Sequence, residues 1–473
     1  MKTKTNFRWY ICTMLFVATT INYMDRQVLS LTWKDFIAPE FNWTNNDYGN
    51  VTALFSIFYA ISMLVAGPLI DWLDTKKGFL WAIGIWSAGA CLHAFSGIFT
   101  AGYVTDTWTL SFSHAKEAIE MASNTGMIVS ASVTFFIFAR LVLAFGEAGN
   151  FPAAIKTTAE YFPKKDRALA TSIFNAGATV GALGAPLTIP FIAEAYGWEM
   201  SFIIIGALGF IWMGAWVFLY EKPEKHKKVS EDELAYIQQD NDMDVEPTDG
   251  KRKNVNLLKC FSYKQTWVFI VGKFMTDGVW WFFLFWTPAY LSSIYGMDST
   301  EAAIPLFILY TITLLAIIGG WLPSYFVDKG KHPYDARLKS MFIFALFPLL
   351  TLLAQPLGRI SYWIPVIIIG IAGAAHQAWS ANIFSIVGDL FPRKAIATIT
   401  GIGGLAGGIG SFFINKGSGM LFDYSKETQM KFMGFQGEES GYFIIFGVCA
   451  VAYMIAWVTM RALLPKYEQV TDL

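Results

Sequence analysis

Two acid–arginine pairs lie within segments that are otherwise apolar enough to cross a membrane. Asp25 and Arg26 fall in FVATTINYMDRQVLSL, and Arg140 and Glu147 fall in TFFIFARLVLAFGEAGNF. An ionised side chain at the centre of a bilayer costs about 2.5–3.5 kcal/mol on insertion scales. Such groups persist where they face a wet cavity or one another, and by default they mark an ion or substrate pathway. The sequence therefore predicts a pathway lined by these four residues.

Helix geometry gives these residues different tasks. Asp25 and Arg26 are adjacent, so their side chains diverge by about 100°, whereas Tyr23 shares the face of Arg26. A guanidinium is always charged and presents a planar fork to a carboxylate, which makes Arg26 the best candidate for binding an anionic substrate. Arg140 and Glu147, two turns apart, form a possible proton switch, and Asp25 is a second proton carrier. The alternative for each pair is a static brace between helices.

A third pair of charges lies in WVFIVGKFMTDGVWWFFLFWTPAYL. Lys273 and Asp277 are four residues apart, so they can satisfy each other on one helix face. The alternative for Lys273 is contact with the substrate. Trp280, Trp281 and Trp286 follow, and one of them on the cavity side would offer a flat wall to a sugar ring.

A group of polar side chains lies in the apolar segment AGAAHQAWSANIFSIVGDL. His376, Gln377 and Asn382 are the candidates for contact with a polyhydroxylated ligand, and Gln377 shares a face with Ser380. Amide and hydroxyl groups also hold membrane helices together, which is the alternative here.

The composition is that of an integral membrane protein. Of 473 residues, 55% are hydrophobic and only 15% are charged, with a mean hydropathy of +0.43. Soluble proteins carry about 25% charged residues. The four cysteines have no metal or disulfide spacing, so we expect no metal or cofactor. The glycine-rich segment GIGGLAGGIGSFF is not a phosphate loop, which argues against an ATP-driven pump, and no catalytic motif indicates an enzyme.

Apolar runs of the length a helix needs to cross a bilayer occur twelve times. They fall at about 9–31, 49–70, 79–99, 127–149, 168–190, 200–220, 266–290, 303–326, 338–356, 362–387, 396–415 and 440–463. They are too long for membrane β-strands, which span about 10 residues. The sequence therefore predicts an all-α membrane protein with twelve transmembrane helices.

Lysine and arginine predict the orientation and the domains. With the N-terminus inside, most of the 35 basic residues fall in inside segments, as the positive-inside rule requires, and both termini are cytoplasmic. The basic residues left outside are Lys34, Lys116, Arg359, Lys416, Lys426 and Lys431. The polar stretch 221–265 predicts a cytoplasmic linker, with a short helix at 229–240, between two six-helix bundles at 1–220 and 266–473. Residues 101–126 predict a long external loop with a surface helix.

The two predicted bundles share a sequence repeat. AEYFPKKDRALAT at 159–171 matches GDLFPRKAIAT at 388–398, and both follow the fourth span of their half. Glu160 aligns with Asp389, and Glu147 aligns with His376. Two parallel repeats with a midplane site between them are the plan of many transporters.

The loop GPLIDWLDTKKG at 67–78 resembles the signature of the major facilitator superfamily. The matching positions include Gly67, Asp71, Lys76 and Lys77. We expect these residues to form a conformational latch between the two halves on the cytoplasmic side. The alternative is an ordinary basic loop.

Longer segments resemble the anion:cation symporter family of that superfamily, in particular its hexuronate transporters. They are RWYICTMLFVATTINYMDRQVLS, GEAGNFPAAIKTTAEYFPKKDRALATSIFNAGATVGALGAP and GAAHQAWSANIFSIVGDLFPRKAIAT. The resemblance implies the superfamily fold, with two six-helix bundles related by a pseudo-twofold axis. It also implies proton-coupled uptake of a sugar acid such as galacturonate or glucuronate, by a protein that is not an enzyme.

The resemblance assigns coupling and binding to Asp25, Arg26, Arg140 and Glu147 and matches two tyrosines to Tyr23 and Tyr59. The other residues are candidates from their own chemistry. Substrate contacts are expected from Arg26, Tyr23, Tyr59, Lys273, Trp280, His376, Gln377 and Asn382. Proton coupling is expected from Asp25, Glu147 and Arg140. We expect a monomer in the inner membrane, with a small anion, protons and the bilayer as partners and no nucleic acid. The alternatives are symport of another organic anion (aldonate, tartrate or phthalate) and export of a drug.

Overall fold

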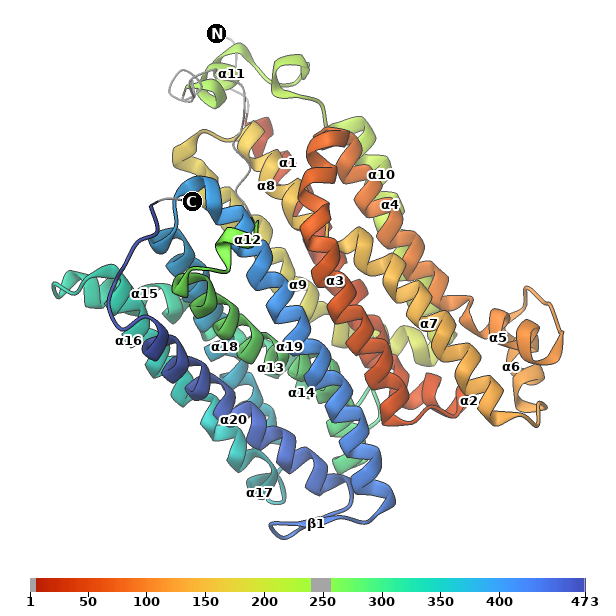
Figure 1. Ribbon diagram of the computed structural model, residues 1–473. Coiled ribbons are helices and arrows are strands. Elements are labelled where there is room, and N and C mark those ends of the chain that lie inside the picture. Colours follow the sequence, from red (N-terminus) through yellow and green to blue (C-terminus); the bar gives the residue numbers. More distant parts are fainter. Residues whose placement is uncertain (1–5, 240–256, 472) are drawn as a thin grey trace.

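The protein is a bundle of long helices that run side by side (Figure 1). The computed structural model describes residues 6–239, 257–471 and 473. Within these residues the only strands form one small hairpin, β1 (Lys431–Phe432) and β2 (Phe435–Gln436), which pair antiparallel. The prediction of an all-α fold is confirmed.

The first group of helices covers the chain up to residue 239. In order they are α1 (Phe7–Thr32), the π-helix η1 (Trp33–Ile37), α2 (Ala38–Phe41), α3 (Asn45–Leu73), α4 (Thr75–Ala94), α5 (Ser96–Thr105), α6 (Phe112–Glu120), α7 (Thr125–Glu147), α8 (Asn150–Tyr161), α9 (Lys164–Tyr196), α10 (Trp198–Leu219), the short η2 (Pro223–Lys225) and α11 (Glu231–Gln238). The expected surface helices in the loop 101–126 and in the linker are α6 and α11. Linker residues 240–256 lie outside the described residues.

The second group begins at residue 257. In order it contains α12 (Leu257–Cys260), α13 (Lys264–Tyr295), α14 (Ala303–Ile312), η4 (Thr313–Ile317), α15 (Ile318–Asp328), α16 (Pro333–Leu346), η5 (Pro348–Leu353), α17 (Ala354–Gly358), α18 (Trp363–Leu390), α19 (Arg393–Glu427) and α20 (Glu438–Leu463). Short 3-10 segments interrupt two of the predicted spans, at η4 and at η5.

Nine helical segments in the described part of the chain are long and apolar enough to cross a membrane. A tenth is the pair α4 and α5, which bends by 50° between Ala94 and Ser96. The predicted spans at 9–31 and 396–415 are α1 and α19, whose polar and glycine residues lower their hydropathy. The number twelve therefore stays a prediction.

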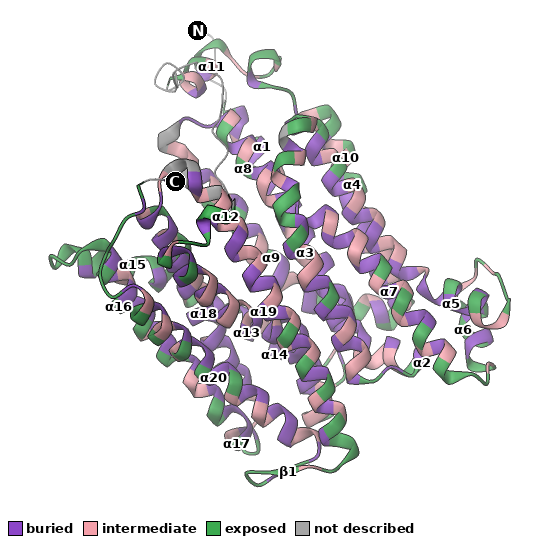
Figure 2. Cartoon of the chain, viewed as in Figure 1, coloured by how far each residue is buried: buried purple, intermediate pink, exposed green. Residues whose placement is uncertain are grey.

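Helix packing divides the bundle into two groups that meet along one seam. In the first group α1 packs along α9, and α4 packs along α7 and α10; in the second, α13 packs along α19 and α20. The seam consists mainly of α3 against α19 and α9 against α14. Figure 2 shows buried residues along the middle of the bundle, where helices face one another, and exposed residues on the connecting segments at both ends.

A close approach of backbones recurs at matching places in the two groups. Gly181 on α9 and Gly410 on α19 each lie 18 residues after the proline of the repeated motif. A Cβ at Gly181 would collide with the carbonyl oxygen of Thr20 on α1, and a Cβ at Gly410 with that of Phe274 on α13. Only glycine permits such contact between membrane helices. The sequence repeat is thus matched by a repeated packing contact.

The two ends of the bundle differ. We call the end that carries α11 and α12 the linker end, and the end that carries the β1–β2 hairpin the far end (Figure 1). At the far end Asp423 of α19 accepts hydrogen bonds from the backbone of Asn45 (3.0 Å) and Asn46 (2.7 Å), the first residues of α3. Lys416 donates to the side chains of Asn46 and Asn50. A carboxylate of one group therefore caps a helix of the other.

Further hydrogen bonds close the same end. Asp35 accepts from the backbone of Ser299 at 2.6 Å, and the Tyr48 hydroxyl donates to the carbonyl of Phe285 at 2.8 Å. The hydrogen bonds that the structure describes between the two groups all lie in the far-end half of the bundle. The far end is therefore held closed.

At the linker end, α11 is fastened to the first group. The buried carboxylate of Glu233 accepts hydrogen bonds from the backbone of Phe7 (3.0 Å) and Arg8 (3.1 Å) and pairs with the Arg8 guanidinium at 3.2 Å. Tyr236 donates to Asp166 at 2.7 Å. Because Glu233 meets the first backbone N–H groups of α1, the linker helix acts as a cap for that span.

Candidate functional site

The candidate site is built around an ion pair between α1 and α7. Arg26 donates from Nε (3.0 Å) and from Nη2 (2.8 Å) to Oε2 of Glu147. Both residues are buried, and Glu147 has no exposed surface. The other oxygen, Oε1, has no hydrogen-bond partner in the structure. Separating a buried pair of this kind leaves both charges uncompensated. The pair is therefore expected to separate only when another anion binds Arg26 or a proton neutralises Glu147.

Three aromatic rings surround the Arg26 guanidinium. Its central carbon lies 5.1 Å from the ring centre of Tyr23, 4.7 Å from that of Tyr59 and 5.2 Å from that of Trp281. Rings at this distance attract a cation and hold the planar guanidinium in place. Trp281 belongs to α13, so the second group of helices completes the surroundings of Arg26.

Asp25 and Arg140 are buried beside this pair without direct ion partners. The Asp25 carboxylate makes no hydrogen bond of good geometry, but the indole N–H of Trp86 lies near it and the charges of Glu147 and Arg140 both act on it. Arg140 donates from Nη2 to the carbonyl of Arg26 at 3.4 Å, and its Nε and Nη1 have no partner. We call Asp25, Arg26, Arg140 and Glu147 the charged centre.

The structure identifies the direct partner of Glu147. Arg140 and Glu147 are expected to act together as a proton switch; the direct ion partner of Glu147 is Arg26 of α1, while Arg140 acts on it through charge alone. Seven residues along a helix rise about 10 Å, and the side chain of Glu147 reaches the nearer cation of a neighbouring helix. The divergence of Asp25 from Arg26 is as expected.

A second polar cluster lies in the other group, on α13, α18 and α20. The Nδ1 atom of His376 and the hydroxyl of Tyr453 are 2.7 Å apart, and the rings of Trp280 and His376 stack with centres 5.4 Å apart. Trp280 therefore contacts His376, whereas the tryptophan beside Arg26 is Trp281. The sequence offers Trp280 and Trp281 as equivalent neighbours, and only packing decides which of them reaches the charged centre.

Lys273 and Asp277 satisfy each other on α13, as the spacing predicts. The Nζ–Oδ2 distance is 2.6 Å, with 8% and 14% of the two side chains exposed. The Asp277 carboxylate packs directly on the backbone of α19 at Gly407, where a Cβ would collide with it. Substrate contact by Lys273 stays a prediction, and Asp277 is its ion partner.

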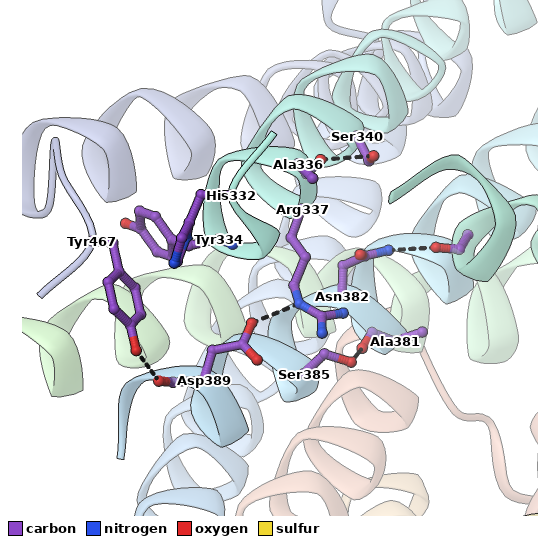
Figure 3. A network of polar contacts seen from close by, with 11 residues as sticks. His332, Tyr334, Ala336, Arg337, Ser340, Ala381, Asn382, Ser385, Asp389 and Tyr467 are labelled. Atoms are coloured by element: carbon purple, nitrogen blue, oxygen red, sulfur yellow. Dashed lines mark hydrogen bonds and ion pairs between the residues drawn. The ribbon is translucent and has the colours of Figure 1, made fainter. Parts of the chain in front are cut away.

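The side chain of Asn382 mainly forms hydrogen bonds within the protein. Its side-chain amide donates to the carbonyls of Gly319 and Ala378, both at 2.8 Å, so only Oδ1 remains for a ligand (Figure 3). Gln377 is half-buried. Substrate contact by these two residues stays a prediction.

The segment 67–78, predicted as a loop, forms the end of α3, Asp74 and the start of α4, and it contacts its own group of helices. Thr75 donates to Glu160 at 2.6 Å, and Lys76 pairs with Glu221 at 3.5 Å. Gly67 has open space around its Cα, and Lys77 is exposed. The side chain of Asp71 lies outside the described residues. A latch between the two groups stays a prediction.

The second group carries a matching contact, drawn in Figure 3. Arg337, near the start of α16, donates from Nε to Asp389 at the end of α18, at 2.7 Å. Asp389 aligns with Glu160 in the sequence repeat, and each acid binds the beginning of the third span of its half. A tyrosine adds a further bond in each case, from Tyr220 to Glu160 and from Tyr467 to the backbone of Asp389.

A bundle of membrane-spanning helices that buries four ions on α1 and α7, where Trp281 of the second group reaches them, is typical of a transporter. The sequence pattern that describes the Major Facilitator Superfamily matches residues 15–414. The chain belongs to this superfamily and is a multi-pass membrane transporter, not an enzyme.

Several of its relatives are described as transporters of sugar acids. The chain is 25% identical over 418 residues to the hexuronate transporter of Escherichia coli (strain K12), which covers 88% of each protein. It is 26% identical to the galacturonate transporter of Dickeya chrysanthemi, over 68% of this chain and 84% of that protein. A probable galactarate/D-glucarate transporter of Escherichia coli (strain K12) is 24% identical over 87% of this chain and 86% of that protein.

Solved structures share the fold. A D-xylose–proton symporter superposes with a TM-score of 0.70 over 98% of this chain and 100% of that chain, at 15% identity. A bacterial homologue of the lysosomal transporter Spinster, in an inward-facing and occupied conformation, gives 0.66 over 98% and 97%, at 18% identity. At these identities the likeness concerns the fold alone.

Proposed function

We propose that this transporter imports a sugar acid together with one or more protons by alternating access. The first candidates are hexuronates such as galacturonate and glucuronate, in keeping with the relatives that transport them. The observation that carries the proposal is the buried Arg26–Glu147 pair, a cation held at the site by an internal carboxylate that a substrate carboxylate can replace.

The charged centre supplies the coupling. A substrate carboxylate binds Arg26 only when Glu147 releases it, and a proton on Glu147 makes that release favourable. Asp25, a buried carboxylate without a direct ion pair, is the second proton carrier. Arg140, with two unpartnered nitrogens beside both acids, stabilises whichever carboxylate is ionised. Proton and substrate transport are coupled if the protein changes conformation in only two states. In one, Arg26 is paired with Glu147; in the other, substrate occupies Arg26 and Glu147 carries a proton.

The remaining residues are proposed to contact the sugar part of the substrate. Tyr23 and Tyr59 flank Arg26, so they border any carboxylate bound to it. Trp280 and His376 form a stacked pair that can border the ring. The further proposed contacts are Lys273, Gln377 and Asn382.

We assign the linker end to the cytoplasm because the basic residues gather there. With the far end held closed, this assignment places the closed side of the bundle outside the cell. The two groups would be six-helix bundles, 1–220 and 266–473, joined by the linker 221–265 and related by a pseudo-twofold axis. The loop with Gly67, Asp71, Lys76 and Lys77 would latch them when the cytoplasmic side closes. We expect a monomer in the inner membrane with both termini in the cytoplasm.

Transport into proteoliposomes tests the proposal. Vesicles that contain the full chain should take up labelled galacturonate when the outside is acidic, and should acidify their lumen as they do so. Empty vesicles are the control. Competition by glucuronate, galactonate, tartrate and phthalate ranks the anions. If none of these anions is taken up or competes, sugar-acid transport is excluded.

One alternative is export of a cationic drug. The charged centre argues against it, because Arg26 and Arg140 place two fixed positive charges where a cation would bind. Competition by organic cations, and not by sugar acids, would favour the alternative.

A further inference from the structure

The Lys273–Asp277 pair is a second cation–carboxylate pair within a membrane-spanning helix, and the charged centre does not use it. Lys273 and Asp277 are 2.6 Å apart and mostly buried, on the helix that also supplies Trp281 to the site. The pair contacts other helices through Gly407 of α19 and the ring of Phe384 on α18, but it forms no ion pair with either helix. Placing two ions on one membrane span costs free energy, and residues kept at that cost by default mark an ion or substrate pathway.

The pair lies close to Arg26 along α13. Trp281 contacts the Arg26 guanidinium, and Asp277 is one turn earlier on nearly the same face. The rise from Trp281 is about 6 Å to Asp277 and about 12 Å to Lys273. The ammonium group, which bonds to Asp277, lies between these two levels.

A second path of contacts gives the same placement. The Asp277 carboxylate packs on Gly407 of α19, and the next residue, Gly408, packs on Ala60 of α3. Ala60 follows Tyr59, whose ring lies 4.7 Å from the Arg26 guanidinium. The pair therefore faces α19, the helix that packs on α3, which carries Tyr59.

We propose that Lys273 and Asp277 form a second anion subsite, which accepts an acidic group at the opposite end of the substrate. This inference rests on the proposed function. Each group of helices holds one cation with an internal carboxylate, Arg26 with Glu147 and Lys273 with Asp277. A linear sugar diacid would replace both internal carboxylates, one at each end.

The length of such a ligand is comparable with the axial rise along α13 from Trp281 to the Lys273–Asp277 pair. The terminal carbons of an extended six-carbon chain are about 6 Å apart, at roughly 1.2 Å of advance per bond. The carboxylate oxygens and their hydrogen bonds extend this reach at both ends. A sugar acid with a single carboxylate would bind Arg26 and leave Lys273 with Asp277.

Two ligands that differ only at one end test the proposal. Galactarate and galactonate have the same carbon chain, with a carboxylate or a hydroxymethyl group at C6. We expect the full-length transporter in proteoliposomes to take up galactarate with a kcat/KM at least about tenfold above that of galactonate. Lys273→Gln should reduce this ratio to near one, and Lys273→Arg should preserve it.

Two further variants separate the subsite from folding and from surface charge. The double variant Lys273→Gln with Asp277→Asn leaves no unpaired charge, and it should also lose the preference. Arg461→Gln removes an exposed pair with Asp335 at the linker end, and it should keep the wild-type ratio.

The outcomes distinguish this inference from the proposed function. If the wild-type protein takes up galactarate and galactonate equally well, or if both Lys273→Gln and the double variant keep the preference, the second subsite is wrong while sugar-acid transport stands. If no sugar acid is taken up at all, the proposed function fails and the second subsite fails with it.

Discussion

Arg26 donates two hydrogen bonds to one oxygen of Glu147, Oε2, and leaves the other oxygen, Oε1, without a partner. The guanidinium is thus occupied by an acid of the protein itself, across 121 residues of sequence. An incoming carboxylate has to compete with Glu147 for the same cation. This competition links substrate binding to the protonation of Glu147 and gives the first prediction.

Glu147→Gln should separate exchange from accumulation. Glutamine cannot take up or release a proton, so substrate can still exchange across the vesicle membrane while a pH gradient no longer drives its accumulation. Uptake of labelled substrate is measured with and without the gradient, and counterflow is measured in preloaded vesicles. A Glu147→Gln protein that still concentrates substrate against its gradient would remove Glu147 from proton coupling.

Arg26→Lys should weaken substrate binding although it keeps the charge. Lysine has no planar fork to bind a carboxylate with two hydrogen bonds, and it is more strongly hydrated. We expect KM to rise by about tenfold or more, equivalent to about 1.4 kcal/mol. Arg461→Lys, at an exposed pair, is the matched control and should leave KM unchanged. Equal KM values for wild type and Arg26→Lys would mean that the substrate carboxylate binds elsewhere.

Asp423→Asn should loosen the far end. The carboxylate caps α3 through the backbone of Asn45 and Asn46, and a neutral amide caps it less well. A cysteine at Ser56, on the α3–α19 seam, should react about tenfold faster with an impermeant thiol reagent added from the far-end side.

Asp47→Asn is the control for that experiment, because Asp47 belongs to the capping box of α3 within its own group. It removes a carboxylate from the same helix end without touching α19. Faster labelling in Asp47→Asn than in Asp423→Asn would show that capping of α3, and not the contact between the groups, keeps the far end closed.

Glu40 should make stability depend on pH. Burial raises the pKa of the Glu40 carboxyl from 4.5 to about 7. The hydrogen bond that Trp198 donates to it at 2.9 Å lowers the pKa, as does the charge of Lys116. The charges of Glu199 and Glu120 raise it. The folded protein therefore keeps a proton that the unfolded chain releases above pH 4.5. This contribution to stability is present at low pH and is lost as the pH rises through about 7.

Thermal unfolding in detergent between pH 5 and pH 8 measures the effect. The Tm of the wild type should fall over this range more steeply than that of Glu40→Gln, which carries no titrating group at the position. Parallel curves for the two proteins would show that Glu40 is ionised throughout.

Glu233→Gln should detach the linker helix. The Glu233 carboxylate accepts from the backbone of Phe7 and Arg8 and pairs with the Arg8 side chain, and it is fully buried. Loss of its charge leaves the Arg8 guanidinium buried without its partner, at a cost of about 3 kcal/mol. Faster protease cleavage near α11 is the expected readout. Glu224→Gln, at an exposed site in the same linker, is the control.

Much of the fold could be predicted from the sequence. Length and hydropathy give most of the helices, because a membrane-spanning segment must satisfy its backbone internally over about 20 residues. The surface helices α6 and α11 also follow from their patterns. The breaks at η4 and η5 and the bend after Ala94 could not be predicted, because they depend on neighbouring helices.

The sequence by itself determined which ions are buried. Asp25, Arg26 and Glu147 stand in apolar segments, and the spacing of Lys273 and Asp277 fixed their contact, since four residues bring side chains together on any helix.

Only the tertiary structure decided which ion binds which across the bundle. Glu147 meets Arg26 and not Arg140, and Trp281, not Trp280, reaches the guanidinium. Helical periodicity gives the direction of a side chain around its own axis, but not the rotation and depth at which two helices pack. Those depend on close contacts such as that of Gly181 with the backbone of α1, which form only in the assembled bundle.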